Sequence, residues 1–199
     1  MAPKGVTTTS GSGCEMIAFE SAIEFRRWLT KNHSQVEGIW MRIYKLESTT
    51  LSITYAEALD EALCFGWIDG QKKSKDSQSW LQKFTPRRPR SGWSKRNTEH
   101  VDRLIKSKKM RGPGLKEVEA AKVDGRWSLA YESFGKAIMP DDFLKELSKH
   151  GAAREFFDTL SKTNRYSIFY RLQTAKKPET RERRMRQIIE MLKRGESFH

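Results

Sequence analysis

Residues 55–70 read YAEALDEALCFGWIDG, and this stretch holds the signals that begin and end one helix. Thr54 is a favourable N-cap. Glu57 follows at the spacing of a capping box, in which each side chain bonds the other residue's backbone amide. We therefore expect a helix from Tyr55. Its packing face is expected to hold the apolar residues at helical spacing, Ala56, Leu59, Ala62 and Leu63.

The helix is expected to end near Gly66, because glycine adopts the left-handed conformation of a helix C-terminus without strain. Asp69-Gly70 is a turn dipeptide and predicts that the chain reverses there as a hairpin. Cys64 has apolar neighbours and no histidine nearby in sequence, so we expect a small core residue rather than a nucleophile. The helix also carries carboxylates that are acid or base candidates if buried together, with a solvated face or ion pairs as the alternative: Glu57, Asp60 and Glu61.

Residues 84–97 read FTPRRPRSGWSKRN, a second stretch, which contains both aromatic and basic residues. Pro86 and Pro89 exclude regular strand pairing, so residues 85–92 are expected to form a surface loop. Guanidinium groups can grip a carboxylate or phosphate at two points, and indole rings can wall a planar group. The candidate ligand-binding site is therefore Trp67, Asp69, Arg87, Arg88, Trp93 and Asn97.

An alternative interpretation of these residues is structural. Trp67 and Trp93 fill a core in that case, and Asp69 caps a turn. Asp124 and Arg126 are further site candidates, and a turn with a partnered arginine explains them equally well.

The net charge of +13 is concentrated in the middle of the chain. Residues 1–69 carry 6 basic and 9 acidic side chains, a net charge of −3, whereas residues 70–126 carry 17 and 6, a net charge of +11. Residues 127–199 carry 15 and 10, a net charge of +5. Such a surface concentrates anions: a small molecule, nucleic acid or an acidic partner. A purely solubilising surface is the alternative.

Apolar runs in this sequence fall short of the roughly 20 residues that span a bilayer, and the first residues lack the pattern of a signal peptide. We expect no membrane insertion. Cys14 lies in a polar tail and Cys64 in an apolar helix, so a disulfide is not expected. Reduced thiols fit a cytoplasmic location.

The rest of the chain divides into segments of different periodicity. Residues 1–16 are small, polar and glycine-rich, which predicts a disordered tail. A helix is expected over residues 19–29 and strands over 38–45, 51–53 and 67–85, the last interrupted by a basic loop. Apolar spacing predicts further helices around residues 101–105, 115–121, 143–147, 156–160, 166–172 and 185–192.

These segments predict an α+β fold with a small antiparallel sheet in the N-terminal half and a mostly helical C-terminal half. We expect a tail over residues 1–16, an α+β core with the cationic and aromatic site over 17–135, and a helical module over 136–199. Arginines near the start of the last helix oppose its dipole and are expected to face acids or an anion, with a solvated face as the alternative: Arg181, Arg183, Arg184 and Arg186.

The strings EALDEALCFGWIDGQ, FTPRRPRSGWSKRN and AKVDGRW, in this order, resemble the YdeI/OmpD-associated family, also called bacteriocin-protection proteins. Residues 140–195 resemble the family's helical module through PDDFL, AKKPETR and a closing amphipathic helix. The resemblance covers residues 19–195. It implies an association with tolerance of bacteriocins and related stress, and it implies no particular reaction.

Signatures of common nucleotide, hydrolase and metal chemistry are missing from the sequence. It contains no GxxxxGK[ST] loop, no GxGxxG after a strand and no GxSxG elbow. The histidines are scattered, with no two at i, i+4 spacing: His33, His100, His150 and His199. We expect neither a metal nor a cofactor.

The sequence favours a stress-tolerance factor that binds an anionic small molecule in a cationic, Trp-lined cleft. One alternative is a nucleic-acid-binding protein that uses residues 70–126 and the arginines of the last helix, with aromatic rings for stacking. Another alternative is an enzyme in which Asp69 or Glu61 acts as acid or base.

Overall fold

The structure is a computed structural model that describes residues 8–9, 14–132 and 135–199. The chain forms two compact units. The α+β unit comprises Met1–Ser91 and Asn97–Ser128, and the helical unit comprises Gly92–Arg96 and Leu129–His199. Residues 92–96, which the sequence places in the α+β part, thus group with the helices.

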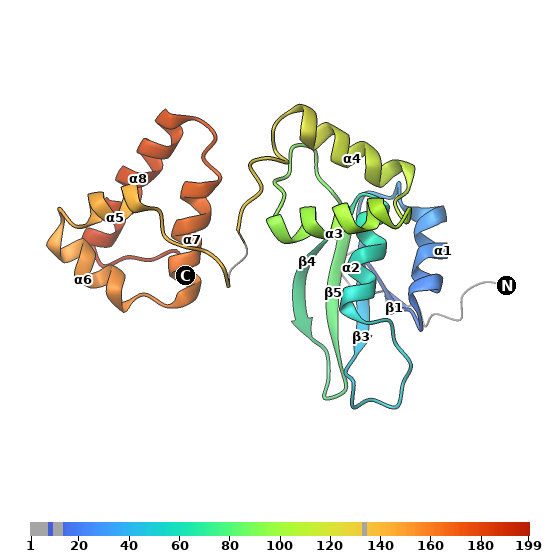
Figure 1. The fold of residues 1–199 in the computed structure, drawn as a ribbon. Helices are drawn as coiled ribbons and strands as arrows, with labels where there is room; N and C mark the ends of the chain where they lie inside the picture. Colours follow the sequence, from blue (N-terminus) through green and yellow to red (C-terminus); the bar gives the residue numbers. More distant parts are fainter. Residues whose placement is uncertain (1–7, 10–13, 133–134) are drawn as a thin grey trace. The chain divides into compact units, whose positions relative to one another are not determined.

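The α+β unit contains a five-stranded sheet (Figure 1). Its strands lie in the order β1-β2-β3-β5-β4. The strands are β1 (Thr8–Thr9), β2 (Glu15–Ala18), β3 (Ile39–Tyr44), β4 (Trp67–Ser74) and β5 (Ser79–Pro86). Pairing thus extends through Thr85 and Pro86, which were expected in a loop, because a proline is tolerated at the end of a strand. The predicted α+β class is confirmed, but the sheet is mixed because β2 runs parallel to β3.

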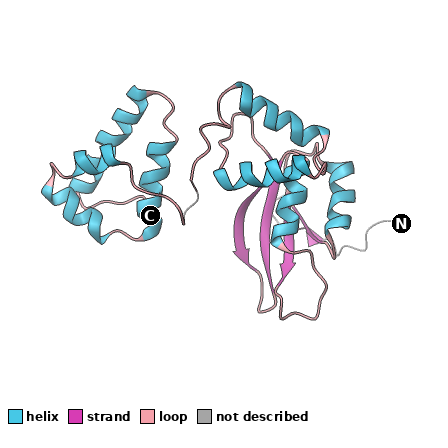
Figure 2. Ribbon diagram, in the orientation of Figure 1, coloured by secondary structure: helices cyan, strands magenta, loops and turns pink. Residues whose placement is uncertain are grey.

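One face of the sheet packs on α1 (Ala22–Asn32) and α2 (Tyr55–Cys64), which lie against it in Figure 2. Side chains in a strand alternate between the two faces. Ile39, Met41 and Ile43 occupy the packed face of β3 and are buried. Phe84 lies opposite Ile39, and its ring centre is 5.9 Å from that of Phe25 on α1.

Helix α2 begins and ends where its sequence predicts. Thr54 and Glu57 form both bonds of the capping box, and Gly66 has a φ of +77° just beyond the helix. Ala58 is buried and Ala56 is exposed, so the packing face is rotated slightly from the predicted one.

Two more helices, α3 (Lys95–Lys106) and α4 (Gly112–Val123), follow β5 in the chain. Helix α4 begins at Gly112 with Pro113 in its first turn, where proline is well tolerated. Gly114 is buried, and a Cβ atom at this position would lie 2.3 Å from the Cys64 carbonyl oxygen. A side chain is therefore excluded at the closest approach of α4 to α2.

The helical unit contains α5 (Asp141–Leu147), α6 (Gly151–Thr159), α7 (Lys162–Gln173) and α8 (Pro178–Lys193). These helices confirm the predicted helical C-terminal part. They enclose a separate core that consists of Phe143, Leu147, Ala153, Phe157, Ile168, Leu172, Ile188, Ile189 and Leu192.

Three further local predictions differ from the structure. Strand β4 continues through Asp69 and Gly70, with a register shift before Lys72, and the chain reverses only after Ser74. The Gln82 amide holds the irregular segment by donating to the carbonyl oxygens of Gly70 and Gln71, at 2.9 and 3.3 Å. Residues 51–53 form no strand.

The third difference is the N-terminal segment. Strand β2 begins at Glu15, and Cys14 is buried with its thiol donating to the Glu37 carbonyl oxygen at 3.2 Å. The expected disorder through residue 16 is therefore wrong for residues 14–16, and also for residues 8–9, which form β1 beside β2. Residues 1–7 and 10–13 lie outside the described part of the chain.

Candidate functional site

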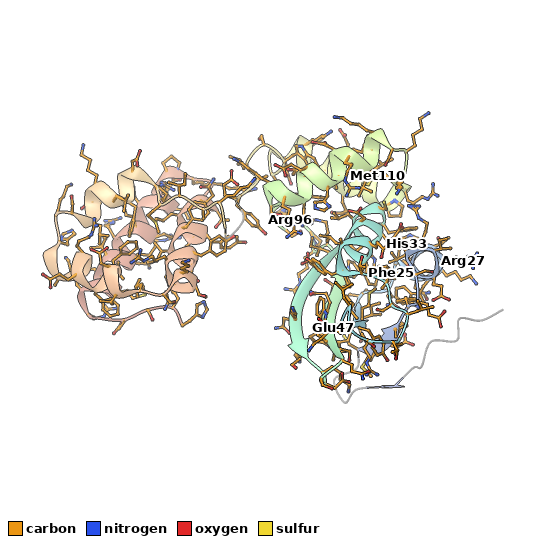
Figure 3. The ribbon with its side chains drawn as sticks, turned by 60° about the horizontal axis from the view of Figure 1, so that its bottom comes forward. Phe25, Arg27, His33, Glu47, Arg96 and Met110 are labelled. Atoms are coloured by element: carbon orange, nitrogen blue, oxygen red, sulfur yellow. The ribbon has the colours of Figure 1, made fainter. Side chains whose placement is uncertain are left out.

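Trp67, the first residue of the predicted site, is a core residue of the α+β unit. It is fully buried, and its indole N–H donates to the carbonyl oxygen of His33, which Figure 3 labels, at 2.8 Å. Its ring meets that of Trp28 edge-on with 5.7 Å between centroids. Both the ring and its donor are therefore engaged inside the protein.

Three further predicted site residues lie near the same strands. Asp69 accepts a hydrogen bond of 2.7 Å from the hydroxyl of Tyr55 on α2. Arg87 is buried, and its backbone amide donates to the Gly66 carbonyl oxygen at 2.9 Å. Arg88 is exposed. Backbone bonding thus places Arg87 beside the start of β4.

The last two predicted residues belong to different units. Trp93 is buried in the helical unit, where its carbonyl oxygen accepts from the Tyr131 amide at 2.9 Å. Asn97 lies on α3 within the α+β unit and is buried. The structure therefore assigns Trp93 to one unit and the other five residues to the other.

The carboxylates of α2 have separate partners. The Thr54 backbone amide donates to Glu57 and lowers the pKa of that carboxyl. Burial raises the pKa of Glu61, whose carboxylate accepts from Arg26 at 2.7 Å. Burial also acts on Asp60, but bonds from Arg103 and His100 outweigh it and lower the pKa of Asp60. Glu61 and Asp60 are therefore ion-paired and Glu57 belongs to the capping box, which agrees with the alternative of ion pairs rather than a shared acid or base site.

Cys64 and the pair Asp124 and Arg126 have structural roles in the α+β unit. Burial raises the pKa of the Cys64 thiol to about 11, so the thiol is neutral near pH 7. The Arg126 guanidinium donates to Asp124 at 2.6 Å and to the Ser91 carbonyl oxygen at 2.8 Å. This agrees with the expected turn with a partnered arginine.

The helical unit contains a surface groove of about 560 Å³ between the end of α7, α8 and the residues that follow α8. We call it the arginine groove because Arg171, Arg184, Arg186 and Arg194 line it. Its apolar surface comes from Ile188, Met191 and Phe198, and its acidic residues are Glu190 and Glu196.

Both acidic residues of the arginine groove already have cationic partners. Glu196 accepts from Arg194 at 2.9 Å, and Glu190 accepts from Lys193 at 2.8 Å. These hydrogen bonds lower the pKa of both glutamates, so both are ionised near pH 7. Lys193 and Arg194 therefore neutralise the negative charge of these two glutamates, and the other arginines of the groove are not needed for it.

Backbone and ring contacts hold two of the three remaining arginines. The Arg184 guanidinium donates to the Arg171 carbonyl oxygen at 2.6 Å. The Arg171 guanidinium lies 4.1 Å from the centre of the Phe198 ring. Within the described residues, Arg171, Arg184 and Arg186 make no ion pair, so three positive charges of the groove lack a carboxylate partner.

Comparison with protein families follows the division into two units. The family described as Domain of unknown function (DUF8412) matches residues 17–117, which is half of the chain. The chain belongs to the DUF8412 family. The family described as Bacteriocin-protection, YdeI or OmpD-Associated matches residues 136–195. Searches of curated proteins and of solved structures found no match.

The second match confirms the resemblance seen in the sequence and limits its extent. It covers α5 to α8 and so includes most of the arginine groove. The strings EALDEALCFGWIDGQ and FTPRRPRSGWSKRN lie within the DUF8412 match instead, and AKVDGRW lies in neither. The YdeI/OmpD-associated part is therefore the helical module alone.

The sequence indicated only part of the arginine groove. Arg184 and Arg186 belong to the arginine run of the last helix, whereas Arg181 of the same run pairs with Asp142 at 2.8 Å. Arg171 and Phe198 gave no signal, because their proximity depends on how α7 packs beside the end of α8. Among the described residues, no cluster of side chains could hold a metal ion. None of the described helices is long and apolar enough to cross a membrane.

Proposed function

We propose that this DUF8412 family member binds an anionic small molecule with an apolar part in the arginine groove of its YdeI/OmpD-associated module. One observation carries the proposal. Arg171, Arg184 and Arg186 face one groove without a carboxylate partner among the described residues, while both groove glutamates are already paired. An anion would supply the missing negative charge.

The chemistry of the groove defines the ligand class. A guanidinium presents a planar fork of donors that matches carboxylate and phosphate oxygens at two points. Ile188, Met191 and Phe198 give the same groove an apolar surface. A volume of about 560 Å³ lies in the range of small-molecule sites, about 300–1,000 Å³. The expected ligand therefore carries a phosphate or carboxylate on an apolar body.

Two of the three arginines are already held in place. Arg184 is bonded to the Arg171 carbonyl oxygen, and Arg171 lies on the Phe198 ring. Ordering a free arginine side chain costs conformational entropy on binding, so a held side chain loses less. We propose this groove in place of the six-residue cleft, because Trp67 and Trp93 are buried core residues of two different units.

Calorimetric titration with phenyl phosphate tests the site. We expect binding by the wild type, and weaker binding of both phenol and inorganic phosphate, which lack the charge or the ring. Loss of one charge-assisted hydrogen bond costs at least about 1.5 kcal/mol, which is roughly tenfold in Kd. We therefore expect Arg171→Gln and Arg186→Gln each to weaken binding by about tenfold.

Arg183→Gln is the matched control. Arg183 is exposed on the same helix, carries the same charge and does not line the groove. Equal weakening by Arg183→Gln would mean that general surface charge attracts the ligand and would contradict the proposal. Native mass spectrometry of the purified protein would then identify a molecule that copurifies with the wild type but not with Arg171→Gln/Arg186→Gln.

We further propose that this binding serves tolerance of bacteriocins or related stress in the cytoplasm. The description of the family that matches residues 136–195 supports the tolerance role. Cys14 and Cys64 are buried and form no disulfide with each other, which supports the location. Survival of bacteriocin-treated cells should fall when Arg171→Gln/Arg186→Gln replaces the wild type at equal abundance. Equal survival would contradict the role without affecting the binding site.

A further inference from the structure

The sheet of the α+β unit has a second face, opposite the one that packs on α1 and α2. Trp40, Arg42 and Tyr44 point to this face, because they alternate along β3 with the buried Ile39, Met41 and Ile43. Register places Lys83 opposite Trp40 and Leu81 opposite Arg42. Lys73 lies opposite Leu81 on β4. We call these six residues the cationic sheet face.

Cations and aromatic rings are paired on the cationic sheet face. The ammonium group of Lys73 lies 4.5 Å from the centre of the Trp40 ring, and that of Lys83 lies 5.7 Å from it. The Arg42 guanidinium lies 4.5 Å from the centre of the Tyr44 ring. Two rings on one strand therefore each have positive charge beside them.

The positive charge of this face is only partly neutralised. Arg42 pairs with Asp76 at 2.7 Å. Lys73 and Lys83 make no ion pair within the part of the chain that the structure describes, and their ammonium groups contact the Trp40 ring instead. A contact between a lysine and an aromatic ring is weaker than a charge-assisted bond between the same lysine and a phosphate, so a phosphate can replace it. Both ammonium groups are thus available to an anion.

We propose that the cationic sheet face binds single-stranded nucleic acid. Unpaired bases stack on aromatic side chains, while lysines and arginines bind the phosphates between them. Trp40 is only 6% exposed, and the Lys73 and Lys83 ammonium groups lie beside its ring, so in the proposed complex these side chains move from the ring to phosphates and a base takes their place on the ring. One movement therefore supplies both kinds of contact.

Geometry favours a single strand over a small molecule or a duplex. Trp40 and Tyr44 are four residues apart on an extended strand, about 13 Å, so their rings suit successive parts of a chain rather than one compact ligand. The sheet that carries this face has five strands at about 4.8 Å spacing and is therefore about 19 Å wide. The major groove of duplex DNA is about 12 Å wide and cannot admit the whole sheet. This inference is independent of the arginine groove, which lies in the other unit.

The test is fluorescence anisotropy with a labelled 12-nucleotide oligothymidine and a duplex of equal length at two salt concentrations. We expect wild-type binding to the single strand and at least tenfold weaker binding to the duplex. Lys73→Gln/Lys83→Gln should weaken single-strand binding about tenfold or more. The slope of the logarithm of the binding constant against the logarithm of salt concentration (the salt slope) should also become shallower by about 1.4. Each of the two lost phosphate contacts contributes about 0.7 to this slope on a single strand.

Two control variants locate the effect. Lys106→Gln/Lys116→Gln removes the same charge from exposed positions on α3 and α4 and should change affinity less than twofold. Arg171→Gln/Arg186→Gln in the arginine groove should leave oligothymidine binding unchanged. Equal loss in Lys106→Gln/Lys116→Gln would indicate non-specific attraction and would overturn the proposal. Loss confined to the groove variant, equal binding of the duplex or no binding of oligothymidine would overturn it as well.

Tyr44→Leu tests stacking without removing charge. Tyr44 is half-buried at the surface, so a leucine keeps apolar contact with the sheet while it removes the ring. We expect weaker oligothymidine binding with an unchanged salt slope, because no phosphate contact is lost. Unchanged affinity in a folded Tyr44→Leu protein would rule out stacking on this residue and, with it, the proposed arrangement.

Discussion

Replacement of Trp67 by alanine tests whether this residue is core rather than part of a ligand site. The side chain is fully buried between β4 and α1 and packs edge-on against Trp28. A tryptophan buries about 150–250 Å², which corresponds to roughly 4–6 kcal/mol at about 25 cal/mol/Å². This is an upper bound, because the alanine retains part of the contact and the unfolded chain is partly compact.

The hydrogen bond of Trp67 adds to this loss. Its indole N–H donates to the His33 carbonyl oxygen, and a buried bond of this kind contributes about 1 kcal/mol. Together these terms predict that Trp67→Ala lowers the free energy of unfolding by about 3–5 kcal/mol, the usual range for deletion of a core aromatic residue. Trp67→Phe retains most of the ring and should cost about 1–2 kcal/mol.

Native-state hydrogen exchange measures this effect separately in each unit. A loss of about 4 kcal/mol corresponds to roughly a thousandfold faster exchange. We expect this acceleration for the slowest amides of α1, β3 and β4 in Trp67→Ala, and unchanged exchange in α6 and α8 of the helical unit. If the β4 amides of Trp67→Ala exchange as slowly as in the wild type while ligand binding is lost, the reasoning is refuted and Trp67 is part of a binding site.

Three further perturbations test particular contacts. Gly114→Ala should lower Tm by several degrees in a thermal melt, because the new Cβ would lie 2.3 Å from the Cys64 carbonyl oxygen. Gly112→Ala is the control and should leave Tm unchanged, because the space around Gly112 is open. Equal Tm values for the two variants would contradict the packing of α4. Asp60 has a lowered pKa in the folded state. Its ionised carboxylate therefore stabilises the folded state fully above the unfolded pKa of about 3.9, and this stabilisation is lost as pH falls below that value. The stability difference between wild type and Asp60→Asn in urea titrations should therefore shrink as pH falls below about 3.9 and through the lowered folded pKa, and a difference independent of pH would show that the carboxylate charge is not involved. Cys64, with a pKa of about 11, should resist iodoacetamide at pH 8 until the protein unfolds, and rapid labelling of the folded protein would contradict its burial.

Elements that depend on local signals were predicted well. The capping box of Thr54 and Glu57 and the left-handed Gly66 define α2 within a few residues of sequence. The helices of the helical unit follow from their apolar spacing in the same way. These features could be predicted because the interactions that stabilise each boundary lie within one or two helical turns.

Elements that depend on distant partners were missed. Strand β2 has only four residues and is placed by parallel pairing with β3, in which Ile17 lies opposite Met41. Asp69-Gly70 favours a turn locally, but strand pairing and the Gln82 amide carry β4 through it. In both cases a contact far along the chain outweighs the local preference.

The candidate site was predictable in its chemistry but not in its position. Aromatic and basic residues in the middle of the chain suggested a single cleft, yet Trp67 is a core residue and Trp93 belongs to the other unit. The arginine groove combines Arg171 of α7 with Phe198 beyond α8, which only the packing of the helical unit brings together. Charge is visible in a sequence, whereas the partner of each charge depends on the fold.

The most direct test of anion binding in the arginine groove is a two-dimensional NMR spectrum of the arginine side-chain Nε–H groups during titration with phenyl phosphate. These signals report on the guanidinium groups themselves. We predict saturable shifts for Arg171, Arg184 and Arg186 and no shift for Arg183, which lies outside the groove on the same helix. Unchanged groove signals at saturating phenyl phosphate, or equal shifts for Arg183, would contradict the proposed site.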